Sequence, residues 1–293
     1  MSAPIDLARV RALFSNPQAI APSAFLRREI AARMHERLAL VKLVPRRVID
    51  AGCGEGADIA LLQKVYPAAQ ILGVDAAAPM LGVAHQPGAA RGLLSRLLPS
   101  KAGIDLLCGD FGNLPFGPNS ADLVWSNLAL HWHPQPDRVF AEWRRVLRVE
   151  GLLMFSNFGP DSLRELRTAF SVLDGSAHVL PFVDMHDLGD QLVEAGFSTP
   201  VMDMEVITVT YDTAQALLAD VRALGGNPLA SRRRGLIGRA AWGRVLAALE
   251  AQRRPDGKLG LTFEVIYGHA FRPASRVTAA GEAIVRFEPR RKS

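Results

Sequence analysis

Arg47-Val-Ile-Asp-Ala-Gly-Cys-Gly-Glu-Gly56 is the most informative stretch of this sequence. The β-branched run at 47–50 is typical of a buried strand, and the glycines at 52, 54 and 56 predict a tight turn. Residues 57–66 then have helical character and stop before Pro67. A strand, a glycine turn and a helix in this order predict a nucleotide-binding corner, because the free N–H groups of the helix start face the ligand.

Strands and helices alternate on both sides of this corner. A helix is expected over Pro22 to Val44, where apolar residues recur at helical spacing. Downstream, apolar runs predict further strands at 71–75, 104–108, 121–125 and 152–157, with helices at 79–85 and 136–149. Residues 86–103 are broken by prolines and glycines and are expected to form a loop. Nearly continuous apolar strands that alternate with helices indicate a parallel sheet covered on both faces.

The pattern changes after Phe158. We expect helices at 161–173, 184–195, 213–224 and 236–252, and strands at 201–209 and 261–271. The two strands could pair antiparallel at the sheet edge, and the helices could form a lid. The expected class is therefore α/β, a Rossmann-like and mostly parallel seven-stranded sheet with helices on both faces. Residues 1–45 would be an N-terminal helical segment, and 46–293 the main domain with helical insertions at about 159–195 and 212–258.

Composition narrows the class of protein. Apolar residues make up 49% and charged residues 22%, which is ordinary for a folded cytosolic chain. The formal charge of +5 favours acidic partners, and we find no nucleic-acid motif. Cys53 and Cys108 form no metal-ligand pattern, so we expect no metal. The sequence shows neither a secretory signal nor an apolar run of the roughly 20 residues that span a bilayer. A cytoplasmic protein without a membrane partner is expected.

Acidic residues stand at the ends of three predicted strands. Asp75 can accept both ribose hydroxyls of an adenosine, since a carboxylate offers two acceptor oxygens. Asp110 could accept an adenine N6 amine beside the apolar Phe111. Gly52-x-Gly54-x-x-Ala57 also satisfies the loose dinucleotide fingerprint. However, Asp50 stands directly before the turn, where it would oppose a diphosphate and attract the amino group of a methionine moiety.

Val48-Ile-Asp-Ala-Gly-Cys-Gly-Glu-Gly56 resembles the first motif of class I methyltransferases. The resemblance implies S-adenosylmethionine as the cofactor. It assigns Asp50, Gly52 and Gly54 to the amino-acid part, Asp75 to the ribose, and Asp110 with Phe111 to the adenine. Asn127, in Ser126-Asn-Leu128, stands where that family contacts methionine.

Later motifs are similar to the malonyl-acyl-carrier-protein O-methyltransferases of biotin synthesis. They are Trp125-Ser-Asn-Leu-Ala-Leu-His-Trp132, Glu142-Trp-Arg-Arg-Val-Leu-Arg-Val-Glu-Gly151, Gly159-Pro-Asp-Ser-Leu-Arg-Glu-Leu166 and Phe182-Val-Asp-Met-His-Asp-Leu-Gly-Asp190. The resemblance covers about residue 10 to residue 272. It implies methyl transfer to the free carboxylate of malonyl-acyl-carrier protein, an acidic partner.

Two alternatives share parts of this pattern. A sister group, the mitochondrial complex I assembly factors that act as arginine hydroxylases, matches Phe25-Leu-Arg-Arg-Glu-Ile30 at least as well. Residues 16–23 also lack the tyrosine that biotin-pathway members commonly carry after the phenylalanine matching Phe14. A scaffold that only binds S-adenosylmethionine is the second alternative.

The expected reaction needs few catalytic groups. A malonyl carboxylate is ionised at neutral pH, so no general base is required. The carboxylate should be bound by a cationic side chain. Arg145 is the first candidate, and Arg144 is the second. His131, Trp132 and His133 could line the acceptor pocket. An acidic carrier protein could be met by Arg164, Arg167 and the run at 232–234.

Overall fold

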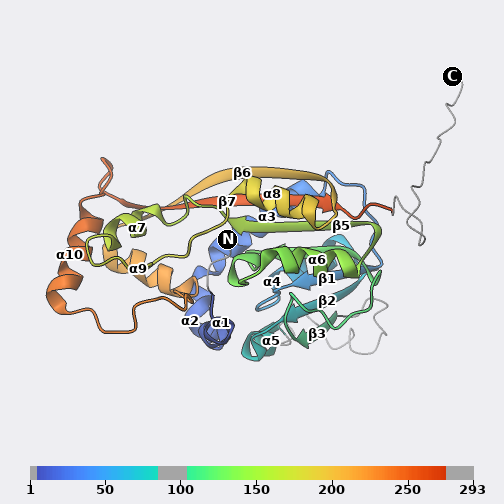
Figure 1. Cartoon of the computed structure of the whole chain (residues 1–293), viewed down its shortest axis with the longest axis horizontal. Coiled ribbons are helices and arrows are strands. Elements are labelled where there is room, and N and C mark those ends of the chain that lie inside the picture. The colour runs from blue at the N-terminus through green and yellow to red at the C-terminus, as the bar shows by residue number, and fades with distance from the viewer. Residues whose placement is uncertain (1–4, 85–103, 275–293) are drawn as a thin grey trace, which may run out of the picture.

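The computed structural model describes residues 5–84 and 104–274 (Figure 1). Seven strands form one sheet in the order β3-β2-β1-β4-β5-β7-β6. The first five strands pair in parallel, and β7 pairs antiparallel with both β5 and β6. The bounds are β1 Arg47–Ala51, β2 Gln70–Asp75, β3 Ile104–Cys108, β4 Ala121–Asn127, β5 Leu147–Phe158, β6 Ser198–Tyr211 and β7 Leu259–Phe271. The predicted α/β class and the antiparallel pairing of the last two strands are confirmed.

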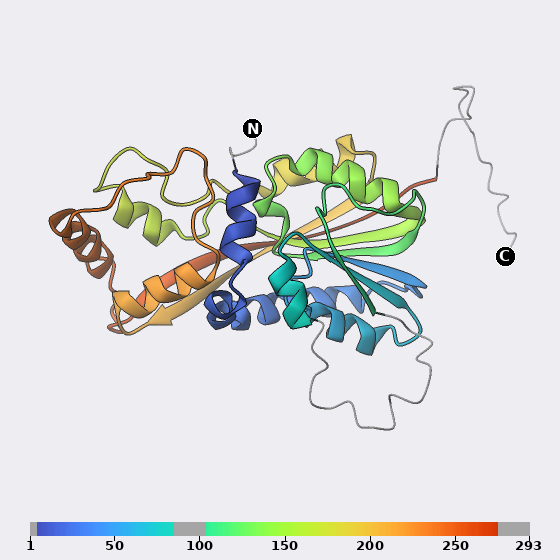
Figure 2. The ribbon, with the colours of Figure 1, turned by 90° about the horizontal axis from the view of Figure 1, so that it is seen from below.

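Helices cover both faces of the sheet because alternate residues of each buried strand point to opposite sides. Val48 and Ile49 of β1 belong to two different core clusters: Val48 is grouped with residues of the helices at 24–38 and 57–65, and Ile49 with residues of the helices at 136–146 and 185–194. Figure 2 shows helices on both sides of the sheet. The helices are α1 Leu7–Phe14, α2 Pro17–Ile20, α3 Ala24–Leu38, α4 Ala57–Val65, α5 Ala78–Ala84, α6 Pro136–Val146, α7 Arg164–Phe170, α8 Met185–Glu194, α9 Ala214–Ala223 and α10 Arg239–Glu250.

Strands β6 and β7 run past the parallel part of the sheet toward one end of the molecule. At that end α7, α9 and α10 gather over the ribbon (Figure 1). We call these three the lid helices. The short helices α1 and α2 lie between the lid helices and the parallel strands (Figure 2). This arrangement places the N-terminal segment beside the carboxyl ends of β1, β2 and β4.

Several boundaries differ from the sequence expectation. Two helices precede α3, and each begins at a capping side chain: Asp6 accepts from Arg9 N and Asn16 from Ala19 N. Helix α3 ends at Leu38 and not at Val44. Val44 is 95% exposed, whereas Val41 and Leu43 pack against the core outside the helix. Helix α6 ends at Val146 because the next residue, Leu147, pairs with β4.

Two predictions fall outside the described residues: the loop at 86–103, and the frayed, solvated tail that the sequence predicts for the basic run Arg290-Arg-Lys292. Within the described ranges, no helix combines the length and apolar character that crossing a membrane requires.

Candidate active site

The glycine turn after β1 is shaped by close backbone contacts. Gly52 has φ +83°, and a Cβ there would come within 2.3 Å of the Ala129 Cβ. Gly52 N donates to Val74 O at 2.8 Å, which ties the turn to β2. Gly54 and Gly56 also have positive φ, and α4 begins directly after Gly56. The sequence therefore folds this turn over the carboxyl ends of β1 and β2, as predicted.

Asp75 joins this turn to the end of β2. Its Oδ2 accepts from Gly54 N at 2.9 Å, and its Oδ1 accepts from Ala77 N at 2.8 Å. Burial raises the pKa of Asp75, although the two backbone donors act in the opposite direction. Each carboxylate oxygen has a second acceptor site. Asp75 can therefore hold the loop and still accept hydrogen bonds from a ligand.

A cavity of about 100 Å³ lies at this corner. The backbone of the glycine turn and the side chain of Asp75 form part of its wall, and residues of α1 form another part. Phe111 and Met80 supply apolar surface for a flat ring. The lining residues are Val10, Arg11, Phe14, Arg27, Gly52, Gly54, Asp75, Ala76, Ala77, Met80, Phe111, Asn127, Leu128, Ala129 and Trp132. We call this the cofactor cavity.

Five of the seven residues that the sequence assigned to the cofactor line this cavity: Gly52, Gly54, Asp75, Phe111 and Asn127. The other two, Asp50 and Asp110, are not in its wall. Asp110 directly precedes Phe111, and its Oδ1 accepts from Gly112 N at 2.8 Å.

Asp50 is buried at the end of β1, and its Oδ2 has no hydrogen-bond partner among the described residues. Burial and the carboxylates of Asp58 and Asp75 raise the pKa of Asp50. A positively charged ligand group would relieve this unpaired acceptor.

Arg27 supplies the opposite charge, and sequence reasoning missed it. It lines the cofactor cavity, and its Nη1 donates to Ser23 Oγ at 2.6 Å. Its Nη2 is buried 3.5 Å from Glu55 Oε1 and has no hydrogen-bond partner within residues 5–84 and 104–274. Burial lowers the pKa of Arg27. Arg27 thus forms an ion pair with Glu55 but keeps a donor without a hydrogen-bond partner, and Asp50 has a carboxylate oxygen without one. Together these two groups fit a zwitterionic amino-acid group.

A signal for Arg27 is present in the sequence. The buried stripe of α3 runs through Ala31, Met34 and Leu38, and Arg27 is one helical step before Ala31 on that stripe. An arginine on a buried helix face needs an anionic partner. That spacing indicates an interior role for Arg27, which distinguishes it from the exposed Arg28.

Asn127 holds the N-terminal segment against the sheet. Its Nδ2 donates to Arg27 O at 3.0 Å, and its Oδ1 accepts from Ser156 Oγ at 2.8 Å. The next residue, Leu128, has φ +51°, a left-handed conformation that costs a non-glycine residue about 1–3 kcal/mol. The backbone therefore bends sharply where β4 enters the cavity wall.

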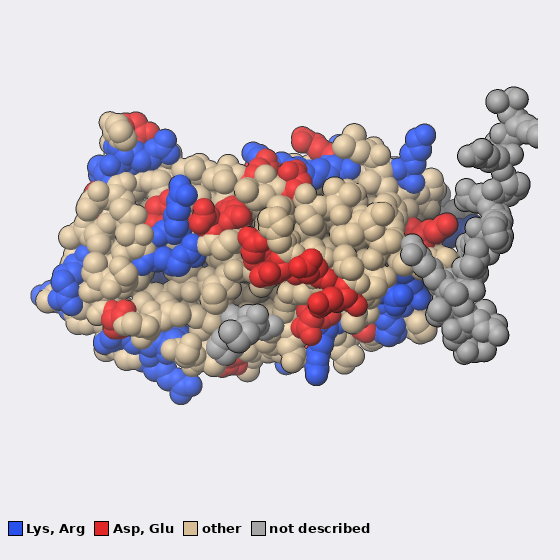
Figure 3. All heavy atoms as spheres, turned by 45° about the horizontal axis from the view of Figure 1, so that its top comes forward, with Lys and Arg blue, Asp and Glu red and all other residues tan. Residues whose placement is uncertain are grey.

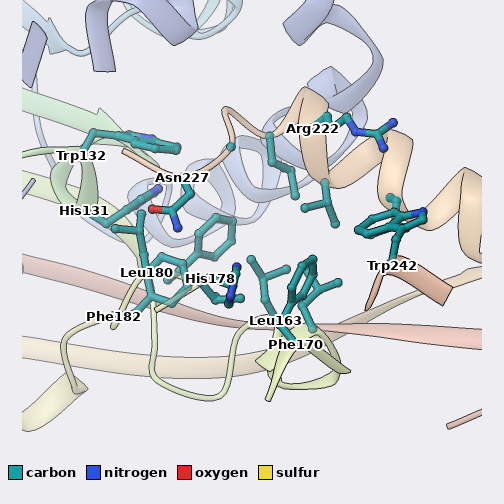
Figure 4. Close-up of a pocket in the computed structure, with 17 residues that line it drawn as sticks. His131, Trp132, Leu163, Phe170, His178, Leu180, Phe182, Arg222, Asn227 and Trp242 are labelled. Carbon is teal, nitrogen blue, oxygen red and sulfur yellow. The ribbon is translucent and has the colours of Figure 1, made fainter. Parts of the chain in front are cut away.

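A second cavity, of about 220 Å³, lies under the lid helices (Figure 4). Its walls are mostly apolar, and Trp132 lines both cavities. Figure 4 shows His131 and Trp132 at one end and Trp242 with Arg222 at the other. The lining residues are His131, Trp132, Phe158, Leu163, Leu166, Phe170, His178, Val179, Leu180, Phe182, Leu218, Val221, Arg222, Leu224, Gly226, Asn227 and Trp242. We call this the acceptor cavity.

His131 has a defined protonation pattern. Its Nδ1 lies 3.0 Å from Asn157 Oδ1, and Asn157 Nδ2 donates to Phe158 O at 3.2 Å. That second bond identifies the Asn157 oxygen as the atom facing His131, so His131 Nδ1 carries the proton. Burial lowers the pKa of His131 to about 4. The ring is therefore neutral at pH 7, with Nε2 as an acceptor.

Arg145, the sequence candidate for binding the acceptor carboxylate, lies away from both cavities. Arg145 Nε pairs with Glu142 Oε2 at 2.6 Å, and its Nη2 donates to Leu114 O. Neither Arg145 nor Arg144 lines either cavity, and Arg144 Nε donates to Gly196 O. Helix α6 runs from the carboxyl end of β4 back to the start of β5. Its last turn, which carries Arg144 and Arg145, therefore lies at the amino ends of the parallel strands, opposite the edge where the cavities lie.

The comparisons with known proteins agree with this architecture. Residues 49–155 match the methyltransferase domain family. The crystal structure of YcgJ from Bacillus subtilis superposes with a TM-score of 0.57 at 14% identity, covering 83% of this chain and 98% of that one. A putative methyltransferase from Bacillus halodurans gives 0.56 at 17% identity, covering 83% and 99%. At these identities the likeness is one of fold.

Relatives in sequence extend over nearly the whole chain. A malonyl-[acyl-carrier protein] O-methyltransferase of Laribacter hongkongensis is 48% identical, covering 97% of this chain and 96% of its own length. One of Gallionella capsiferriformans is 46% identical, with 96% of each chain covered. Matches of this extent cover nearly the whole chain and not the methyltransferase domain alone. The chain belongs to the malonyl-[acyl-carrier protein] O-methyltransferase family.

Proposed function

We propose that the protein transfers a methyl group from S-adenosylmethionine to the free carboxylate of malonyl-acyl-carrier protein. The product would be the malonyl methyl ester that the resemblance assigns to biotin (pimeloyl) synthesis. The observation that carries the proposal is the near-full-length identity to relatives of that name. The cofactor cavity, which Asp75 and Arg27 line, and the apolar acceptor cavity meet at Trp132, and this arrangement supports it.

The residues of the cofactor cavity match the parts of S-adenosylmethionine. Asp75 would accept from the ribose hydroxyls, and Phe111 would pack on the adenine next to Asp110. Arg27 would bind the methionine carboxylate, and Asp50 would attract its ammonium group. When bound, the cofactor supplies a methyl group activated on a positively charged sulfur.

The acceptor cavity would prepare the second reactant without acid or base catalysis. The malonyl carboxylate is already ionised, so the protein needs to orient it and to exclude water. The apolar walls remove hydration from the carboxylate oxygen. Trp132 would form the wall at which the two reacting groups meet, and neutral His131 would shape the pocket beside it.

The partner would be an acyl carrier protein, the acidic protein on which the malonyl group is carried. Its identity follows from the family resemblance and suits the net charge of +5 of this chain.

An acceptor panel tests this function. Purified protein is incubated with methyl-labelled S-adenosylmethionine and malonyl-, acetyl- or unloaded carrier protein, and base-labile label on the carrier is counted. We expect label on the malonyl form alone. Label on the acetyl form, or tight cofactor binding without any transfer, would contradict carboxyl methylation and favour the hydroxylase or scaffold alternative.

A further inference from the structure

The acceptor cavity opens at one place. Of its lining residues, only Arg222 and Gly226 are exposed, and the others are buried or partly buried. Both exposed residues lie at the end of α9 and in the turn that follows. On the other side of the opening Trp242 of α10 forms the wall. The exposed part of the cavity wall therefore lies between α9 and α10.

The chain around this opening is strongly basic. Between residues 213 and 249 there are six arginines and one acidic residue, Asp220. Asp220 already accepts from Tyr211 OH at 3.0 Å. Arg234 and Arg239 are exposed and have no ion pair with any described residue. We call residues 232–239, which connect α9 to α10, the basic loop. Arg233 of this loop pairs with Asp174 Oδ2 at 2.7 Å, and its other three arginines have no ion pair among the described residues.

The basic loop also carries an apolar side chain in solvent. Leu236 is 96% exposed, with arginines on both sides of it in the sequence. One exposed leucine is unremarkable alone. Next to Arg234 and Arg239, which have no ion pair with any described residue, it has the composition of a small protein interface, where charges surround an apolar contact.

Acidic side chains lie on a different part of the surface, around α8. Asp184, Asp187, Asp190 and Glu194 lie on or beside α8, and residues 182–194 contain no lysine or arginine. Figure 3 shows acidic side chains in the middle of this face and basic side chains over the end formed by the lid helices. An acidic partner would be repelled from α8 and drawn toward the cavity opening.

From this charge separation we infer that the basic loop is the docking surface for the acidic carrier protein, and that docking there presents the acyl arm to the opening at Arg222. The inference rests on the proposed function, because that function supplies the acidic partner. Long-range attraction by Arg234 and Arg239 would orient the carrier, and Leu236 would provide the apolar contact.

The double variant Arg234→Glu/Arg239→Glu tests the docking surface. The matched control is Arg46→Glu/Lys64→Glu, which changes the net charge equally at exposed positions away from the opening. Each protein is assayed with malonyl-carrier protein and with malonyl-pantetheine, which lacks the carrier. We expect the basic-loop variant to raise KM for the carrier-bound substrate at least tenfold and to leave malonyl-pantetheine unchanged. The control should leave both unchanged.

Binding of the unreacted carrier protein by titration gives a readout independent of turnover. We expect the Kd to rise by the same factor, and added salt to weaken wild-type binding. Unchanged carrier binding in the basic-loop variant, or an equal loss in the control, would overturn the inference. Failure of wild-type protein to methylate either substrate, despite intact carrier binding, would instead count against the proposed function.

Discussion

Phe14 packs edge-on against Trp132, with ring centroids 5.1 Å apart and ring planes at 81°. Both side chains line the cofactor cavity, and Trp132 continues into the acceptor cavity. The segment that carries Phe14 is held to the chain beyond α9, because Asp6 N donates to Pro228 O at 3.0 Å. A Cβ on Gly225 would come within 2.8 Å of Trp132, so the wall between the cavities is tightly packed. The N-terminal helices thus close the site.

Phe14→Ala should weaken binding of S-adenosylmethionine by about tenfold. The substitution removes an apolar wall of the cavity. Full burial of a phenylalanine side chain contributes about 1.5–3 kcal/mol, so partial loss of this contact corresponds to about a tenfold change in Kd. Calorimetric titration gives the Kd. The control is Phe25→Ala, the same change at a side chain that is 46% exposed and does not line the cavity. Equal affinities for wild type and Phe14→Ala would show that α1 does not close the site.

Arg27→Ala should reduce affinity for S-adenosylhomocysteine by about 10- to 100-fold, because a charge-assisted hydrogen bond to the ligand carboxylate is lost. Affinity for 5′-methylthioadenosine should hardly change, since that nucleoside has no amino-acid group. The exposed neighbour substitution Arg28→Ala serves as the control. Parallel losses for both ligands would indicate a general defect in the pocket and exclude the assigned role.

His131 should make stability depend on pH. Its pKa is lowered to about 4 in the folded protein, against about 6.5 when unfolded. Between pH 4 and pH 6.5 the unfolded state binds more protons than the folded state. The contribution of His131 to the free energy of unfolding is therefore complete above pH 6.5 and decreases as the pH falls toward 4. From pH 7 to pH 5 this loss amounts to about 2 kcal/mol.

The variant His131→Asn keeps a donor toward Asn157 and cannot titrate. Urea unfolding at pH 7 and pH 5 should show a smaller decrease in its free energy of unfolding than in that of wild type. Identical pH dependence in the two proteins would mean that His131 is solvated and titrates normally.

Arg145→Ala should retain methyl transfer. The side chain forms a partly exposed ion pair with Glu142. Exposed ion pairs of this kind contribute about 0.2–1 kcal/mol to the free energy of unfolding. Steady-state kinetics should give a kcat/KM close to that of wild type. A large decrease in kcat with unchanged cofactor affinity would restore Arg145 as the acceptor residue and refute the placement of the acceptor cavity.

The sequence predicted those features that depend on neighbours along the chain. The strand, glycine turn and helix at 47–65 are local, and Asp75 follows from the next strand of a parallel sheet. Arg27 and Phe14 could not be assigned in this way, because they reach the cavity only through packing of the N-terminal helices. The position of Arg145 outside both cavities could not be read from the sequence for a related reason. The sequence motif shows that an arginine stands at this position. The direction in which α6 crosses the sheet determines at which edge of the sheet that arginine lies.

A crystal structure of the protein with S-adenosylhomocysteine would test the cofactor assignment on which every other proposal depends. We expect the ribose hydroxyls within hydrogen-bonding distance of Asp75, the carboxylate at Arg27 and the sulfur directed toward Trp132. A ligand that leaves Asp75 facing solvent, or a diphosphate bound at Gly52 and Gly54 in its place, would contradict the account.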